Sequence, residues 1–227
     1  MLYTEDMARM NIRNRDGKRV FYLGKGDNLT PGAKDWLRRE RIEILSAETA
    51  KPAEYHLANG AVLREKPEQM THLNGNVLVP KTHPRIKFRG AMDSLEAELL
   101  LCQLTCKKWQ AELGEILALA RQLIRCEVME ESVPEGKLCG LTMEEQRARS
   151  HRPQDYYGQV HFMPEISDGA VVLHLNRCRT VARAAELAAA AAFLDADGNC
   201  SRVDILKALN RMSSMLYILM IQEKAGR

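Results

Sequence analysis

The feature that most constrains the fold is a long stretch, from Phe88 to Ser132, that contains no proline. Strong helix formers such as alanine, leucine and glutamate dominate it, so it predicts either one very long helix or two consecutive helices. A Thr142–Glu145 capping box begins a shorter helix, and a long helix is predicted from about Gly169 to Leu194. Ser201 with Asp204 is predicted to cap the last helix, which runs to about Gln222. The chain is therefore predicted to be all-α, a bundle of roughly five helices preceded by a mixed segment.

Residues 1–82 differ in character, because turn signals such as "LGKGDNLTPG" and "LNGN" divide them into short pieces. Brief apolar alternations, "RVFYLG" and "NVLVP", are typical of strands or extended segments. One helix is predicted here, with Thr30 as its N-cap and Pro31 at its first position. We therefore expect an N-terminal appendage over residues 1–82 and a helical-bundle domain over residues 83–227.

Composition argues against several functional classes. The formal net charge of +3 is too small to indicate nucleic-acid binding. The longest uninterrupted apolar run, from Leu187 to Leu194, is too short to span a bilayer. No signal peptide is evident, and the six cysteines lack the spacing of a disulfide framework. We expect a cytoplasmic protein with reduced thiols and no nucleic-acid or membrane partner.

Three predicted helices each carry polar residues on an otherwise apolar face. At about 100° per residue, Arg179, Arg183 and Glu186 share one apolar stripe, while Asp93 and Asn210 lie on the stripes of two other helices. A buried carboxylate and a buried guanidinium are each costly alone. Asp93 and Arg179 are therefore predicted to be partners.

Two interpretations of these residues are open. In the structural one, an Asp93–Arg179 pair fixes the helix register and Asn210 caps a neighbouring helix. In the functional one, Arg183 binds an anion, because Asp93 neutralises only one arginine and Glu186 lies three residues away on the same helix. Phosphate is the natural anion, since guanidinium donors match phosphate oxygens in fork geometry.

At these positions the sequence resembles a known family. "RTVARAAE" resembles the "RTVCRRAE" signature of the ATP:corrinoid adenosyltransferases, and "GAMDSLEAE" and "ALNRMSSMLYIL" resemble their "GTxDELNA" and "LNRLSDYLF" motifs. More closely, "HPRIKFRGAMDSLEA", "LTPGAKDWL" and "DILKALNRMSS" resemble the ethanolamine-utilisation (EutT-type) branch, which is related to the PduO-type family. The motifs occur in the right order with matching offsets, over about residues 20–222.

The resemblance implies a homo-oligomer, typically a trimer, with active sites between subunits. It implies transfer of the 5′-deoxyadenosyl group of ATP to cob(I)alamin, which gives adenosylcobalamin and releases triphosphate, with Mg²⁺ on the phosphates. Because Co(I) is already a strong nucleophile, positioning and cationic stabilisation should dominate catalysis. The setting would be ethanolamine utilisation, in the cytoplasm or a bacterial microcompartment. The candidate partners are a cobalamin reductase and the cobalamin-dependent ethanolamine ammonia-lyase.

The resemblance also assigns roles on the nucleotide side. Asp93 and Arg179 match the family's intersubunit ion pair beside the nucleotide, and with Arg183 they are the catalytic candidates. Arg183, Glu186 and Asn210 match residues that bind ATP.

On the cobalamin side, Phe162 of "HFMPE" matches the aromatic residue of the family's "FxLPGG" loop. That ring closes the lower axial face of the corrin and keeps cobalt four-coordinate, so that cobalt can be reduced. His161, beside it, is a second cobalamin-binding candidate.

The sequence also departs from the family pattern. The arginine that follows Arg183 in the family is an alanine here, so some phosphate contacts must come from elsewhere. Lys87 and Arg89, near the start of the first long helix, are candidates. Gly26 and Thr30 are others, because "GKGDNLT" loosely resembles the family's Gly-Asp-Gly-Thr phosphate loop; the alternative is a turn before a capped helix.

The metal site of related enzymes is not expected here. Enteric members of the branch carry a His-x11-Cys-Cys-x2-Cys site before the bundle, whereas this chain has no cysteine before Cys102. The alternative function is a non-catalytic cobalamin-binding or delivery protein, and a third is a purely structural bundle. Arg183 and Asn210 favour the enzyme, since a carrier needs no clamp for triphosphate.

Overall fold

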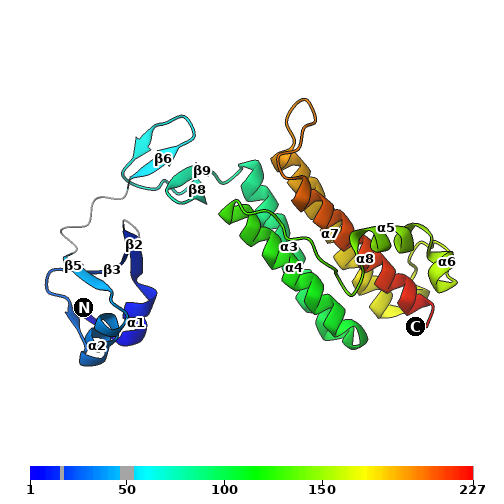
Figure 1. The fold of residues 1–227 in the computed structure, drawn as a ribbon, viewed down its shortest axis with the longest axis horizontal. Helices are drawn as coiled ribbons and strands as arrows, with labels where there is room; N and C mark the ends of the chain where they lie inside the picture. Colours follow the sequence, from blue (N-terminus) through cyan, green and yellow to red (C-terminus); the bar gives the residue numbers. More distant parts are fainter. Residues whose placement is uncertain (16–17, 47–53, 227) are drawn as a thin grey trace. The chain divides into compact units, whose positions relative to one another are not determined.

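The computed structural model describes residues 1–15, 18–46 and 54–226 of the chain. These residues form two compact units, Met1–Glu54 and Tyr55–Arg227 (Figure 1). In the described part of the chain, no helix combines the length and the apolar character that crossing a membrane requires.

The first unit contains short strands and two helices around a small core. Its elements are β1 (Leu2–Tyr3), α1 (Glu5–Met10), β2 (Ile12–Arg15), β3 (Lys18–Leu23), β4 (Asn28–Leu29), α2 (Pro31–Arg39) and β5 (Glu43–Ser46). Strand β3 lies between β2, which is antiparallel to it, and β5, which is parallel, while β1 and β4 form a separate parallel pair. Phe21 and Trp36 are buried in the core between sheet and helices. Thr30 caps α2, as predicted, by accepting a hydrogen bond from the Ala33 amide at 3.3 Å.

The second unit begins with a four-stranded sheet of order β7-β6-β9-β8. Its strands are β6 (Tyr55–Leu57), β7 (Val62–Leu63), β8 (Met70–Asn74) and β9 (Val77–Pro80). Strands β8 and β9 form a hairpin, and Gly75 in its turn has a φ of 52°, a conformation that glycine adopts without strain. This sheet belongs to the same compact unit as the long helices, although the predicted appendage extends to residue 82.

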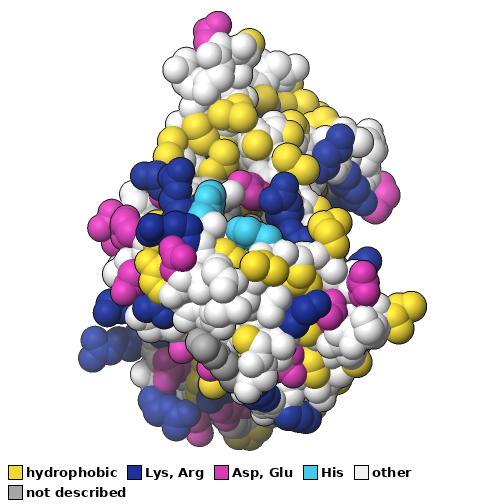
Figure 2. All heavy atoms as spheres, turned by 90° about the vertical axis from the view of Figure 1, so that its right-hand side faces the viewer, with side chains coloured by type: hydrophobic (Ala, Val, Ile, Leu, Met, Phe, Trp, Pro, Cys, Tyr) yellow, Lys and Arg dark blue, Asp and Glu magenta, His cyan; other side chains and the backbone are white. Residues whose placement is uncertain are grey.

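The helices of the second unit follow the sheet. They are α3 (Pro84–Thr105), α4 (Gln110–Met129), α5 (Met143–His151), α6 (Pro153–Tyr157), α7 (Gly169–Phe193) and α8 (Val203–Lys224), with short 3₁₀ turns η2 (Lys107–Trp109) and η3 (Ile166–Asp168). The proline-free stretch is thus two helices, separated at Cys106, where a ψ of 65° ends α3 and lets α4 pack back against it. Helices α5 and α6 pack on α8 near the C-terminus, at the end that faces the viewer in Figure 2.

Helix α7 is the centre of the helical layer, because it packs against both α3 and α8. Ala182, Ala185 and Ala189 are completely buried along its inner face. Side chains this small let neighbouring helices approach closely, and the arginines of α7 lie on its other faces. The alanine-rich half of α7 is therefore close-packed core.

The predicted all-α class is wrong. The described residues are 57% helical, with eight α-helices, and 16% strand, in three β-sheets, so they form a mixed α/β fold. Sequence pattern gives a weak signal for these strands, because they are short and pair with partners far away in the sequence, as β3 does with β5 and β6 with β9. Such pairing depends on tertiary context more than on local pattern.

The predicted cap of the last helix is also wrong. Helix α8 begins after Arg202 without a side-chain cap, and neither Ser201 nor Asp204 acts as one. The Asp204 carboxylate instead accepts hydrogen bonds from the Val133 amide at 2.9 Å and from Arg202 Nη2 at 2.9 Å. Asp204 therefore ties the segment after α4 to the start of α8.

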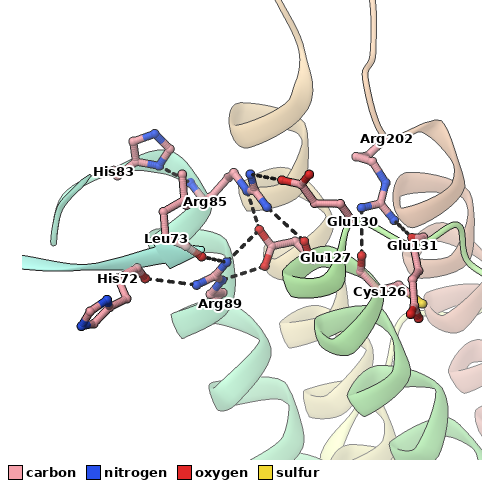
Figure 3. Close-up of polar contacts among 10 residues, drawn as sticks. All are labelled: His72, Leu73, His83, Arg85, Arg89, Cys126, Glu127, Glu130, Glu131 and Arg202. Atoms are coloured by element: carbon pink, nitrogen blue, oxygen red, sulfur yellow. Dashed lines mark hydrogen bonds and ion pairs between the residues drawn. The ribbon is translucent and has the colours of Figure 1, made fainter. Parts of the chain in front are cut away.

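A buried carboxylate joins the sheet to the helices (Figure 3). The Glu127 side chain, near the end of α4, is fully buried, and it accepts hydrogen bonds from Arg85 Nε at 2.5 Å and Arg89 Nε at 2.7 Å. Arg89 Nη2 also donates to the carbonyl oxygen of Leu73 in β8 at 2.8 Å. The cluster thereby fixes the first turns of α3 to the last turn of α4 and to the sheet.

We predict that Glu127→Ala lowers the free energy of unfolding by about 3 kcal/mol, because two largely buried guanidinium groups lose their counter-charge. The matched control is Glu96→Ala, which removes an exposed ion pair between the same two helices, Glu96–Arg121 at 2.9 Å, and should cost less than about 1 kcal/mol. Urea denaturation measures both changes. Equal, small losses would show that the buried cluster does not join α3 to α4.

Candidate functional site

A cationic hollow of about 240 Å³ lies where α5, α7 and α8 meet. Its lining residues are Ser150, His151, His161, Arg179, Arg183, Ser213, Ser214 and Tyr217. They include two arginines, two histidines and three serine hydroxyls, and among the described lining residues there is no carboxylate. Figure 2 shows histidine side chains between groups of lysine and arginine side chains on this end of the molecule. Such a lining is suited to an anion.

Arg179 and Arg183 lie one turn apart on α7, and among the described residues neither has a carboxylate partner. Arg179 is partly buried, and its Nε and Nη2 both donate to Asn176 Oδ1, at 3.1 and 2.9 Å. Burial, and then the neighbouring charge of Arg183, lower the pKa of the Arg179 guanidinium from its usual value. Arg183 is exposed and forms no ion pair within the described part of the chain. The two positive charges therefore remain available to a bound anion.

The predicted Asp93–Arg179 pair does not form within one chain. Asp93 is exposed on α3, and among the described residues it makes no ion pair. The residues that share its stripe are also outside, with Leu100 45% and Leu104 66% exposed. The core face of α3 is a different stripe, which contains Met92, Leu95, Leu99 and Cys102. Periodicity identified an apolar face but could not say which face meets the core.

A second hollow, of about 480 Å³, lies next to the first, displaced by about one helical turn along α7 and α8. Its lining residues are Met143, Glu144, Arg147, Glu186, Leu206, Lys207, Asn210 and Arg211. The structure brings Glu186 and Asn210 together, because Asn210 Nδ2 donates to Glu186 Oε1 at 2.9 Å. Arg211 in turn donates to Asn210 Oδ1.

Three cationic side chains that line this hollow, Arg147, Lys207 and Arg211, are not among the residues predicted from the sequence. Lys207 lies one turn from Asn210 and Arg211 lies next to it, so helical spacing alone could have suggested both. Arg147 comes from α5, and only the packing of α5 on α8 brings it there. Burial and the charge of Arg147 lower the pKa of Arg211.

A hollow of about 600 Å³, larger than either of these two, contains none of the predicted site residues. It lies beside the segment 133–137 and is lined by Glu135, Glu144 and Asp204 as well as by Lys137 and Lys207. Its carboxylates offset its lysines, so it lacks the surplus positive charge of the other two hollows. The volume of a hollow therefore does not identify the anion site.

His161 and Phe162 border the first hollow. His161 Nε2 lies 3.1 Å from the carbonyl oxygen of His151, which can only accept, so Nε2 donates; Nδ1 shares a hydrogen bond of 3.0 Å with the Tyr217 hydroxyl. Phe162 is half-buried against the Tyr217 ring, with centroids 6.2 Å apart. The neighbouring apolar side chains are exposed, Met163 by 85% and Ile166 by 92%. An apolar surface thus adjoins the cationic hollow.

The remaining predicted phosphate ligands lie elsewhere. Lys87 is exposed near the start of α3. Arg89 is committed to Glu127 and to the carbonyl oxygens of His72 and Leu73, so the structure gives it a structural role.

In the first unit, Gly26 has a φ of 83° in the turn before α2, and Thr30 caps that helix. The "GKGDNLT" segment therefore has the geometry of the alternative interpretation, a turn before a capped helix.

Cys102 and Cys106 are buried, free thiols that lie next to each other. Cys102 Sγ donates to Cys106 Sγ at 3.5 Å, and burial raises the pKa of Cys106 to about 12, which keeps its thiol protonated. In the described ranges, no three His, Cys, Asp or Glu side chains gather as a metal ion would require.

Comparison with known proteins identifies the class. Residues 61–223 match the cobalamin adenosyltransferase family. This range includes the two cationic hollows and the Glu127 cluster. The chain therefore belongs to this family, and it is a transferase.

More particularly, the chain is 32% identical to the corrinoid adenosyltransferase EutT of Salmonella typhimurium and 29% identical to that of Escherichia coli K12. Each alignment covers 96% of this chain and 90% of the relative. The predicted family and EutT type are confirmed.

Proposed function

We propose that the protein transfers the 5′-deoxyadenosyl group of ATP to cob(I)alamin, forming adenosylcobalamin and releasing triphosphate, in support of ethanolamine utilisation. The observation that carries the proposal is the pair Arg179 and Arg183, on consecutive turns of α7 in a hollow without a carboxylate among its described lining residues. Family membership supplies the corrinoid chemistry. The uncompensated arginines supply the site for a polyanion.

The reaction depends on side chains that hold and stabilise the triphosphate more than on a general acid or a general base. The cobalt lone pair forms a bond to ribose C5′, the C5′–O bond breaks, and triphosphate leaves with the bonding electrons. Arg183 and Arg179 would stabilise the charge that develops on the triphosphate, with Lys207 and Arg147 in the adjoining hollow. Glu186 and Asn210, already hydrogen bonded to each other, would orient the nucleotide.

We include Mg²⁺ as the counter-ion of the ATP phosphates. Glu144 and Glu186 line the second hollow and offer carboxylate oxygens of the kind that Mg²⁺ prefers. When bound, Mg²⁺ would neutralise phosphate charge beside the cations of α7 and α8.

The corrin would lie against the segment that carries His161 and Phe162. Val160, Met163 and Ile166 expose apolar surface there, which suits a large, largely apolar macrocycle. Phe162 would close the lower axial face, so that cobalt stays four-coordinate and can be reduced. The same apolar surface favours the second candidate function, a cobalamin carrier that does not form the Co–C bond.

We further propose a homo-oligomer, most simply a trimer, in which Asp93 of one copy meets Arg179 of another. The support is the exposed stripe of α3, where Asp93 shares a face with Leu100 and Leu104 that nothing covers within the described residues. A cobalamin reductase and the cobalamin-dependent ethanolamine ammonia-lyase are the proposed partners, in the cytoplasm or a bacterial microcompartment.

The function is tested by mixing the protein with chemically reduced cobalamin, ATP and Mg²⁺ and recording the absorbance change to adenosylcobalamin. Conversion supports the enzyme. Tight binding of adenosylcobalamin without conversion supports the carrier, and no binding of ATP or cobalamin contradicts both.

Arg183→Ala should lower kcat/KM for ATP roughly 10- to 100-fold, because one charge-assisted contact to the phosphates is lost. Its thermal stability should not change, since Arg183 is exposed. Arg177→Ala is the matched control on the same helix: Arg177 pairs with Glu98 at 3.0 Å, outside both hollows, and its loss should change kcat/KM less than about twofold. Similar kinetics for the two variants would refute a phosphate role for Arg183.

Phe162→Ala should impair formation of adenosylcobalamin from Co(II) with a reductant more than formation from supplied Co(I). The ring acts on the coordination of cobalt before reduction, whereas the attack on C5′ needs only Co(I) and ATP. Parallel rate measurements with the two cobalt states give the ratio. Equal losses would remove the shielding role from Phe162.

Asp93→Ala and Arg179→Ala should each be inactive alone, but co-expression of both chains should restore about a quarter of the activity, because randomly mixed copies rebuild intact sites between subunits. Arg179→Ala co-expressed with Arg183→Ala is the control. Both arginines lie on α7 of one chain, so no site is rebuilt. Absence of recovery in the first mixture would place Asp93 outside a shared site.

A further inference from the structure

The segment from Gly158 to Asp168 is attached to α8 at two points. Near its start, His161 shares a hydrogen bond of 3.0 Å with the Tyr217 hydroxyl, and the two rings stack with centroids 5.8 Å apart and planes 5° from parallel. At its end, Asp168 Oδ1 accepts a hydrogen bond from Lys224 Nζ at 2.6 Å. Asp168 is largely buried, with its side chain only 7% exposed.

Phe162 lies between these attachment points and touches both. Its ring packs on Tyr217 at 6.2 Å, and Lys224 Nζ lies 4.4 Å from its centroid. Tyr217 and Lys224 are seven residues apart on α8, which places them two turns apart on the same face. Phe162 is thus held between a tyrosine ring and a lysine cation.

The segment itself has little regular structure to fix the ring. Within the segment, η3 is its one helical turn, and Asp168 holds that turn by accepting a hydrogen bond from the Glu165 amide at 2.9 Å. The hydrogen bond from Lys224 keeps the pKa of Asp168 below its usual value, so the carboxylate stays ionised and both contacts persist. Lys224 therefore acts on Phe162 directly and on the backbone beyond it through Asp168.

We propose that Tyr217 and Lys224 are positioning residues that hold the Phe162 ring in the orientation that closes the lower axial face of the corrin. The inference rests on the proposed function and extends it to two residues of α8. Neither residue belongs to the tight core of that helix, which is formed by Leu216, Leu219 and Met220. Their contacts with Phe162 are therefore separable from the stability of the fold.

The test uses cob(II)alamin bound to the full-length protein with ATP. Electron paramagnetic resonance measures the fraction of four-coordinate Co(II), and a parallel assay measures turnover with supplied Co(I). Lys224→Met should reduce the four-coordinate fraction roughly five- to tenfold, because a cation–π contact and an ion pair are lost together. Turnover with Co(I) should fall less than about twofold.

The matched control is Lys108→Met. Lys108 also lies over an aromatic ring, 4.8 Å from the centroid of Trp109, and also pairs with a carboxylate, Glu223 at 3.1 Å, but it makes no contact with Phe162. It should leave the four-coordinate fraction unchanged. Lys224→Arg, which restores a cation, should recover at least about half of the wild-type fraction.

Tyr217→Phe removes one oxygen atom and keeps the ring stacked, so it should lower the four-coordinate fraction by about threefold. If Lys224→Met fails to fold, this variant decides alone. The proposal is overturned if both Lys224→Met and Tyr217→Phe behave as the wild type, or if Lys108→Met causes the same loss as Lys224→Met. Failure of the proposed function is distinguishable, because then the wild-type protein itself gives neither four-coordinate Co(II) nor conversion of Co(I).

Discussion

The Glu127 carboxylate, completely buried between Arg85 and Arg89, is the interaction on which the second unit depends. An isolated charge is very unfavourable at such a position, so the two arginines and the last turn of α4 must come together. Arg89 extends the contact to the edge of the sheet through the Leu73 carbonyl oxygen. The start of α3 is thereby fixed. The position of α7 follows from that of α3, because the two helices pack against each other.

Helix α7, held in place by this packing, carries the arginines of the site. Its buried alanines let α3 and α8 approach closely, and on another face Arg179 and Arg183 face the serines of α8. Two carboxylates that could neutralise arginines are used elsewhere: Glu127 binds Arg85 and Arg89 in the core, and Glu98 pairs with Arg177. The result is a hollow whose positive charge is not neutralised from within the described chain, next to the exposed apolar side chains around Phe162. A polyanion and an apolar macrocycle can be held side by side in such a place.

Several elements could be predicted because they depend on neighbours in the chain. The Thr142–Glu145 capping box has both of its hydrogen bonds, and α7 lies within one residue of its predicted limits. The family resemblance assigned Glu186 and Asn210 to the same ATP-binding site, and their side chains are hydrogen bonded in the structure. Arg89 and Asp93 could not be placed in this way. The partner of Arg89 lies 38 residues away on α4, and the stripe that contains Asp93 proved to be the exposed one.

The sequence by itself determined the class of enzyme, the positions of the long helices and the surplus of arginine on α7. These are properties of residue identity and of spacing within one segment, to which helix propensity, capping and motif resemblance apply directly. Only the tertiary structure decided that the short strands pair into sheets, that Arg89 is structural, and that Tyr217 and Lys224 hold Phe162. Each of these depends on which distant side chain or strand fills the remaining space and satisfies the remaining hydrogen bonds, and no single segment contains that information.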